Sequence, residues 1–341
     1  MAKIGVDVGG TFTDFVSYDR ETKKLSVWKT LSTPSDPGQG IVDGLKDAGS
    51  AEEIEHLRFG TTIATNAVLE RKGAAVAYIA TSGFRDVPFI QRGKRQSHYD
   101  ITWIKAKPLM KRRHSFEVTG RITSRGKEYI PLDLACVRDL ATHIASDNKI
   151  QSIAVCLLFS YVTPMHERKV QEIFQELCPN KPISISYDVL PKWKEHERSS
   201  TTIADAYIKP LVGGHLQSLK ERFSEQGVNK RIAVIKSNGG EMTIDAASEA
   251  PIQLTLSGPT GGVVGAKQIA GLAGVDHLVT LDMGGTSTDV SRFSGTYEHV
   301  FENTTAGVTI QAPQLDINTV AAGGGSRLFF RAGMFQVGPE S

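Results

Sequence analysis

An eight-residue pattern rich in Asp, Gly and Thr occurs twice in the chain, and six of its eight positions are identical in the two copies. An apolar segment typical of a strand precedes each copy, so we expect its first Asp at a strand tip. The two copies are Asp7-Val8-Gly9-Gly10-Thr11-Phe12-Thr13-Asp14 and Asp282-Met283-Gly284-Gly285-Thr286-Ser287-Thr288-Asp289.

These residue types suit the binding of a nucleotide. A carboxylate at a strand tip can hold Mg²⁺ directly or through water, and a Gly-Gly turn leaves backbone N–H groups open to phosphate oxygens. Two such hairpins facing each other across a cleft would hold one nucleotide from both sides. The alternative is that each copy is an ordinary hairpin turn. A turn needs only its glycines, however, whereas the flanking Asp and Thr repeat as well.

We therefore assign a role to each position of the repeat. The predicted catalytic residues are Asp7, Asp14, Asp282 and Asp289; the expected metal ligands among them are Asp7 and Asp282. Asp14 or Asp289 is the candidate for orienting the acceptor of a transferred group. The predicted phosphate-binding residues are Gly9, Gly10, Thr11, Thr13, Gly284, Gly285, Thr286 and Thr288.

Other polar groups are weaker candidates. The segment Gly60-Thr61-Thr62, followed by Asn66, opens a predicted helix, where its N–H groups could receive an anion or a polarised carbonyl. Plain capping of that helix by Thr61 or Thr62 explains the segment equally well. The nine histidines form no zinc-binding pattern, and Cys156 lies in an apolar strand, where a packed core residue is expected.

The elements that must position these residues follow an α/β pattern, with short apolar runs alternating with helical periodicity. The expected strands are 3–8, 11–18, 24–29, 74–80, 153–159, 232–235 and 278–281. Helices are expected from about Pro37, over 164–177, over 197–223 with a kink or break at Pro210, and over 259–272.

Composition limits the class of protein. A chain of 341 residues suggests about two domains. The net charge of +2 gives no general attraction to nucleic acid or to an anionic membrane. A basic stretch at 92–113 is interpreted as a solvated loop or cleft rim, with phosphate or nucleic-acid binding as the alternative. Three cysteines without paired spacing and the lack of a long apolar run indicate a soluble, cytoplasmic protein.

With these motifs in place, the sequence resembles the actin/sugar kinase/Hsp70 superfamily and, within it, the hydantoinase A/5-oxoprolinase family. The resemblance covers essentially the whole chain. At His196 and Asp205 the family pattern has Tyr and Asn, which leaves substrate details open. The segments that carry the resemblance are 5–14, 59–67, 83–86, 99–100, 195–198, 282–289 and 322–326.

The resemblance implies an α/β fold with duplicated RNase H-like lobes around a nucleotide cleft. The first lobe would span 1–274, with a large α/β insertion at about 51–191, and the second would begin at 275–341 and be incomplete. A missing C-terminal half or another polypeptide would complete it. With the second lobe incomplete, we expect apolar faces at 278–281 and 308–310 to be exposed.

The resemblance also implies the reaction. ATP with Mg²⁺ would phosphorylate the carbonyl of a lactam or hydantoin before ring opening, and a B-type hydantoinase subunit or domain would act as partner. The alternatives are an ATP-dependent ketone carboxylase subunit and an actin- or Hsp70-like ATPase module. Gly323, Gly324 and Gly325 become candidates for contacting the adenine. The candidate substrate residues are Gly60, Thr61, Thr62, Asn66, Arg92, Tyr99 and Asp100.

Overall fold

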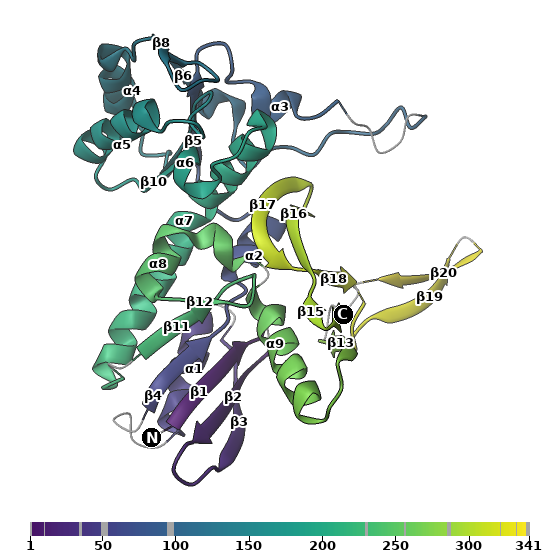
Figure 1. Cartoon of the computed structure of the whole chain (residues 1–341). Coiled ribbons are helices and arrows are strands. Elements are labelled where there is room, and N and C mark those ends of the chain that lie inside the picture. Colours follow the sequence, from purple (N-terminus) through teal and green to yellow (C-terminus); the bar gives the residue numbers. More distant parts are fainter. Residues whose placement is uncertain are drawn as a thin grey trace.

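The structure is a computed structural model that describes residues 2–9, 11–33, 36–48, 54–93, 99–228, 231–255, 257–284, 288–320, 322–331 and 333–338. It has a mixed α/β fold. The buried core of the first sheet extends to one face of the second sheet, whose other face has a separate core. The long helix α7 connects the two sheets, and a third group of strands follows at the C-terminal end (Figure 1). Among the described helices, none is long and apolar enough to cross a bilayer.

The first sheet contains the first copy of the repeated pattern and has the strand order β12-β11-β4-β1-β2-β3. The first three strands form an antiparallel meander, and β4 and β11 run parallel to β1. Helix α1 (Pro37–Lys46) begins at the expected proline and packs Ile41 and Leu45 into the core. The strands are β1 (Ala2–Val8), β2 (Phe12–Asp19), β3 (Leu25–Leu31), β4 (Ile54–Phe59), β11 (Arg231–Ile235) and β12 (Glu241–Met242).

The second sheet is parallel throughout, in the order β10-β9-β5-β6. Helices α4 (Leu134–Ser146) and α5 (Met165–Leu177) contribute to its core. Its strands are β5 (Val76–Thr81), β6 (Ser115–Val118), β9 (Ser152–Cys156) and β10 (Ile183–Ile185). Residues 54–59, which fall within the insertion expected at about 51–191, form β4 and pair with β1 and β11 in the first sheet.

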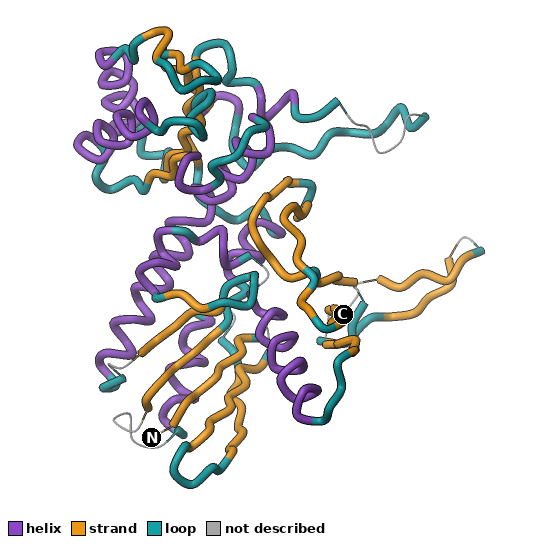
Figure 2. The backbone as a smooth tube through the Cα atoms, in the orientation of Figure 1, coloured by secondary structure: helices purple, strands orange, loops and turns teal. Residues whose placement is uncertain are grey.

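Smaller helices and strands lie around the two sheets. Residues 91–93 and 99–111, between α3 and η2, form no helix or strand, and the latter extend away from the second sheet (Figure 2). The elements are α2 (Ile63–Leu69), α3 (Val87–Ile90), η2 (Arg112–His114), β7 (Arg121–Ile122), β8 (Glu128–Ile130), α6 (Ser186–Val189), α8 (Ile244–Glu249) and η3 (Pro251–Leu254).

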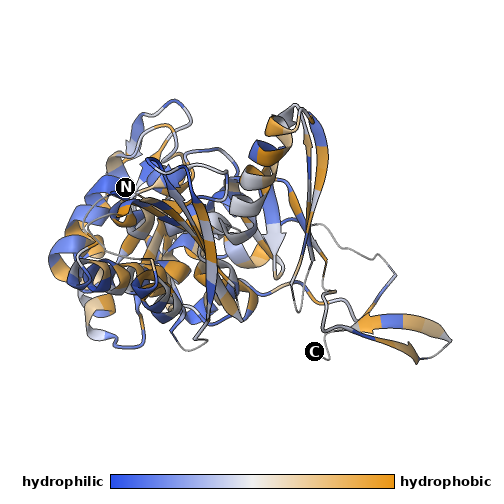
Figure 3. Cartoon of the chain, turned by 90° about the horizontal axis from the view of Figure 1, so that it is seen from below, coloured by the Kyte–Doolittle hydropathy of each residue, from blue (hydrophilic) through white to orange (hydrophobic). Residues whose placement is uncertain are grey.

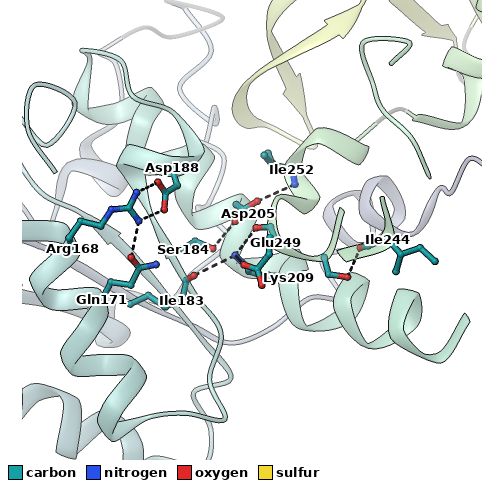
Figure 4. Close-up of polar contacts among 11 residues, drawn as sticks. Arg168, Gln171, Ile183, Ser184, Asp188, Asp205, Lys209, Ile244, Glu249 and Ile252 are labelled. Carbon is teal, nitrogen blue, oxygen red and sulfur yellow. Dashed lines mark hydrogen bonds and ion pairs between the residues drawn. The ribbon is translucent and has the colours of Figure 1, made fainter. Parts of the chain in front are cut away.

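Helix α7 (Glu195–Glu225) joins the two sheets as one helix of 31 residues. The expected kink or break at Pro210 does not end it, because contacts along its length hold it in place. Figure 4 shows part of this junction. The buried Asp205 carboxylate accepts hydrogen bonds from the Ser184 hydroxyl, at 2.7 Å, and from the Ile252 amide, at 3.1 Å. Burial raises the pKa of Asp205, so its two hydrogen bonds matter to the junction.

The C-terminal strands contain the second copy of the pattern. After helix α9 (Ser257–Leu272), β13 pairs with β14, which also pairs with β15 and β18; β16 pairs with β17, and β19 pairs with β20. The strands are β13 (His277–Met283), β14 (Thr288–Ser294), β15 (Thr296–Tyr297), β16 (His299–Thr305), β17 (Val308–Leu315), β18 (Ile317–Val320), β19 (Arg327–Arg331) and β20 (Met334–Gly338).

The two apolar faces expected to be exposed behave differently. Val279 and Leu281 of β13 are exposed as expected, but Val308 and Ile310 of β17 are buried, because β17 packs against α7. The β19–β20 hairpin projects from the molecule, and Figure 3 shows apolar residues along it.

Packing of α1 on the first sheet provides a test of the fold. A Cβ atom at Gly44 would lie 2.1 Å from Cζ of Phe15, so Gly44→Ala should lower the free energy of unfolding by about 1–3 kcal/mol. Gly214 of α7 has no heavy atom within 4 Å of such a Cβ, so Gly214→Ala should raise it by up to about 1 kcal/mol. Chemical denaturation measures both, and equal stability of the two variants would contradict this packing.

Candidate functional site

The first hairpin places its two carboxylates side by side. Asp7 at the end of β1 lies directly opposite Asp14 of β2 in the antiparallel register. The turn between them is closed by a hydrogen bond of 3.0 Å from the Gly9 amide to the Phe12 carbonyl. A Cβ at Gly9 would lie 2.9 Å from that same oxygen, so the turn needs glycine at this position.

The second hairpin repeats this arrangement. Asp282 of β13 lies opposite Asp289 of β14, as in the first hairpin. The Gly324 amide donates to the Gly284 carbonyl at 2.9 Å, so the predicted adenine-contacting segment 323–325 lies beside this turn. The predicted phosphate ligands Gly10, Gly285 and Thr286 lie outside the described residues.

The second Thr of each copy has a different environment from the one expected. Thr13 is fully buried, and its hydroxyl lies 3.0 Å from the Ser32 hydroxyl, which in turn donates to the Gly9 carbonyl. Thr288 is also buried and donates to the Ala322 carbonyl at 2.5 Å. Because both hydroxyls stabilise the turns from inside, they are not open to phosphate. Thr11 is exposed at its turn.

Helix α9 lies between the two hairpins. A cavity of about 350 Å³ beside the first hairpin is lined by Asp7 and Asp14. A cavity of about 310 Å³ beside the second hairpin is lined by Asp282 and Asp289. Gly262 of α9 lines both cavities, so the two carboxylate pairs face a common helix from opposite sides.

The carboxylates of the two hairpins interact electrostatically. Asp7 is solvent-accessible at the cavity surface. Partial burial and, to a smaller extent, the negative charges of Asp282 and Asp14 together raise its pKa from 3.8 to about 6. Lys29 lies 3.5 Å from the Asp14 carboxylate. An excess of negative charge therefore remains where the hairpins meet.

This charge pattern fits a divalent cation. Within the described parts of the chain, no group of three or more His, Cys, Asp and Glu side chains is placed to hold a metal ion. Mg²⁺ ordinarily takes one or two protein carboxylates and completes its shell with phosphate oxygens and water. The pair Asp7 and Asp282 suits that role, because a cation would offset both the burial and the repulsion that raise the Asp7 pKa.

In the segment after β4, some of the predicted substrate residues make structural contacts and others line a cavity. The Gly60 amide donates to the Val6 carbonyl at 3.2 Å. Thr61 is buried: its carbonyl accepts a hydrogen bond of 2.8 Å from the Ser257 hydroxyl, and its own hydroxyl accepts from the Ile63 amide. Thr61 therefore supports the start of α2 and its packing on α9.

Thr62 and Asn66 instead line a cavity of about 500 Å³ together with Asp289. This arrangement connects a predicted substrate segment with a predicted catalytic residue, Asp289, that lies 223 positions after Asn66 along the chain. Asn303 and Thr319 line the same cavity, and Thr319 donates to Asp289 at 2.5 Å. Sequence reasoning missed both residues, because neither belongs to a motif; only strand pairing brings them here.

The structure does not bring the other predicted substrate residues to this site. Arg92 makes two hydrogen bonds, at 2.8 and 2.7 Å, to the buried Glu197 carboxylate at the start of α7. Tyr99 is 97% exposed, and the Asp100 carboxylate accepts hydrogen bonds from Thr102. All three positions belong to the segment that leaves the second sheet, away from the paired hairpins (Figure 1).

The Asp7 environment predicts a pH dependence of stability. Because folding raises this pKa, the native state binds the proton more tightly than the unfolded chain, and the free energy of unfolding should fall as the pH rises from about 4 to about 6. Asp7→Asn should remove that fall in the absence of divalent cations. Thermal melts across this pH range measure it.

Asp19 serves as the control for that measurement. Hydrogen bonds from Thr22, and a weaker one from Glu21, lower the pKa of Asp19. Burial opposes this change with a smaller effect. Asp19→Asn should therefore change the pH dependence in the opposite sense. Identical pH profiles for the wild type and Asp7→Asn would show that folding does not raise the Asp7 pKa as described.

Known proteins resemble this chain over nearly its full length. The 5-oxoprolinase 1 of Arabidopsis thaliana is 36% identical, in an alignment that covers 98% of this chain and 29% of that protein. The crystal structure of the ATP-dependent caprolactamase from Pseudomonas jessenii superposes with a TM-score of 0.87 at 29% identity, over 99% of this chain and 51% of that chain. A nucleotide-free acetone carboxylase structure gives a TM-score of 0.84 at 29% identity, over 99% and 51%.

This chain thus spans about half the length of the two matched structures and under a third of the plant protein. Residues 3–178 match the profile of the hydantoinase/oxoprolinase N-terminal region, and residues 198–341 match the hydantoinase/oxoprolinase profile. On these matches, the chain belongs to the hydantoinase/oxoprolinase family.

Proposed function

We propose that this chain is the nucleotide-binding part of an ATP-dependent enzyme that opens a cyclic amide such as a lactam or hydantoin. The observation that carries the proposal is the pair of matching hairpins, whose carboxylates line cavities on either side of α9. The sheet order, with an antiparallel meander followed by two parallel strands, supports the view that 1–274 and 275–341 belong to two actin-like lobes.

The chemistry explains why such an enzyme needs ATP. An amide carbonyl is a poor electrophile, and transfer of the γ-phosphoryl group to its oxygen gives a phosphorylated imidate that water can attack. Phosphoryl transfer depends mainly on positioning and on the neutralisation of charge. Of the described turn groups, we assign the Gly284 amide and the Thr11 hydroxyl to the phosphates. The Gly9 amide, which was predicted to bind phosphate, already donates to the Phe12 carbonyl.

Two of the four aspartates would hold the metal ion, and one of the other two would orient the acceptor. Asp7 and Asp282 would hold Mg²⁺, which when bound neutralises charge on the phosphates. Asp289 is the better candidate for orienting the acceptor, because it lines both the second hairpin cavity and the cavity that contains Thr62 and Asn66. Asp14 has Lys29 as a partner, which leaves it less suited to that role.

A partner would complete the reaction. A relative that is 30% identical is the alpha subunit of caprolactamase, a name that implies at least one other subunit in that enzyme. We infer that a B-type hydantoinase subunit or domain assists hydrolysis of the activated ring. The alternative reaction, ATP-dependent carboxylation of a ketone, is favoured by the likeness to acetone carboxylase. A requirement for bicarbonate in substrate-dependent ADP release would indicate carboxylation.

Charge removal at the hairpins tests the proposal. In the complete protein with its partner, Asp7→Asn and Asp282→Asn should lower ATP turnover roughly 30- to 1000-fold, which corresponds to about 2–4 kcal/mol of transition-state stabilisation. The fold should persist, because neither side chain packs in the core. Substrate-dependent ADP release and thermal stability are measured on the same preparations.

Asp139→Asn, at an exposed position of α4, is the matched control and should leave turnover unchanged. Wild-type turnover in both hairpin variants would rule out the assignment of this site. A loss of turnover that merely follows a loss of folded protein would support the view that the repeats are ordinary turns.

A further inference from the structure

The cavity that contains Thr62 and Asn66, here called the α2–β18 cavity, has a distinctive composition. Its volume is about 500 Å³, which suits a small ring with a substituent. Its walls come from α2, the end of β16 and β18. The polar side chains along these walls are mainly amides and hydroxyls, namely Thr62, Thr65, Asn66, Asn303, Asn318 and Thr319.

The α2–β18 cavity adjoins the second hairpin cavity. Pro259, Asp289 and Ile317 line both of them, so the Asp289 carboxylate lies where the two meet. Thr319 fixes that carboxylate through a hydrogen bond of 2.5 Å. A ring in the α2–β18 cavity would therefore present its carbonyl toward the side on which we place the phosphates.

The charge in the α2–β18 cavity is negative. Of the described residues that line it, Asp289 is the one with an ionisable side chain, and none is Lys, Arg or His. Two nearby arginines already have partners. Arg71, just beyond α2, lies at the edge of the cavity and donates to the carbonyls of Pro108 and Ala306, and Arg92 pairs with Glu197.

We propose that the α2–β18 cavity binds the amide ring and selects neutral rings over rings that carry a carboxylate. This inference rests on the proposed function, of which it specifies the substrate class. A carboxylate on the ring would be drawn out of water beside Asp289, with no cationic side chain among the described lining residues to receive it. A like charge is an effective means of rejecting a ligand. Amides and hydroxyls, by contrast, can pair with the N–H and C=O groups of a neutral ring.

The inference separates two kinds of relative. The chain is similar both to 5-oxoprolinases, whose named substrate carries a carboxylate, and to a caprolactamase, whose named substrate is a neutral ring. Sequence identity is higher to the plant 5-oxoprolinase, at 36% against 30%. The chemistry of the cavity favours the neutral class despite that difference.

A matched pair of substrates tests this selectivity. 5-Oxoproline and 5-oxoprolinamide share the same ring and nearly the same size, but only the first is charged. For the complete protein with its partner, kcat/KM for substrate-dependent ADP release should be roughly 10- to 100-fold higher with the amide. Equal or higher kcat/KM with 5-oxoproline would overturn the inference and leave the proposed function intact.

Variants of the cavity wall complete the test. Asn303→Lys and Thr305→Lys each add a cation to the wall, and each should shift the preference toward 5-oxoproline. Asn148→Lys, in an exposed turn between α4 and β9, is the control and should leave the preference unchanged. An unchanged preference in both folded wall variants would overturn the inference. If no cyclic amide, charged or neutral, stimulates ADP release, the proposed function falls and the inference with it.

Discussion

Repulsion between carboxylates is the physical constraint on which the site depends. Asp7 and Asp14 lie directly opposite each other in one hairpin, Asp282 and Asp289 do so in the other, and the negative charge of Asp282 reaches Asp7. Like charges opposite one another on a sheet are destabilising. The surrounding structure must therefore hold the hairpins firmly, and it does so through α9 and through turns tied down from inside.

The long helix α7 extends this rigid frame to the second sheet. Its first turn carries the fully buried Arg198, which donates to the Ser160 hydroxyl at 2.6 Å and to the Leu157 carbonyl at 2.7 Å. Glu167, also buried, accepts hydrogen bonds from the Leu157 amide and the Ser186 hydroxyl. The Arg198 bonds join the segment after β9 to α7, and the Glu167 bonds join the ends of β9 and β10 to α5. We regard them as structural, because every group they use is enclosed.

Local features of the sequence were enough to predict several of the elements and the first layer of the site. Apolar runs predicted β1, β2, β3, β5, β9, β11 and β13, and proline positions predicted the starts of α1 and α5. They did not indicate β6, β10 or β12, and the repeat at 7–14 and 282–289 indicated two hairpins. These features succeed because a strand, a turn and a cap are determined by neighbouring residues.

Features that depend on tertiary contacts were not predictable in the same way. The repeat contains two Thr, and nothing local shows that Thr13 faces the core while Thr11 faces solvent until the partner Ser32 is placed. Arg92 read as a free cation, because its partner Glu197 lies 105 positions away. Pro210 suggested a break that the packing of α7 does not permit.

The β16–β17 hairpin shows how packing far from the chemistry shapes the site. Its outer end supplies Asn303 to the α2–β18 cavity, while its return strand is fixed to α7 by a bond of 2.6 Å from the Ser200 hydroxyl to the Thr309 carbonyl. The Gln311 amide adds a second bond, of 2.9 Å, to the Thr201 hydroxyl. The position of one cavity wall therefore depends on the same helix that carries the second sheet. A change in how α7 meets that sheet would alter the width of the cavity without touching a residue that lines it.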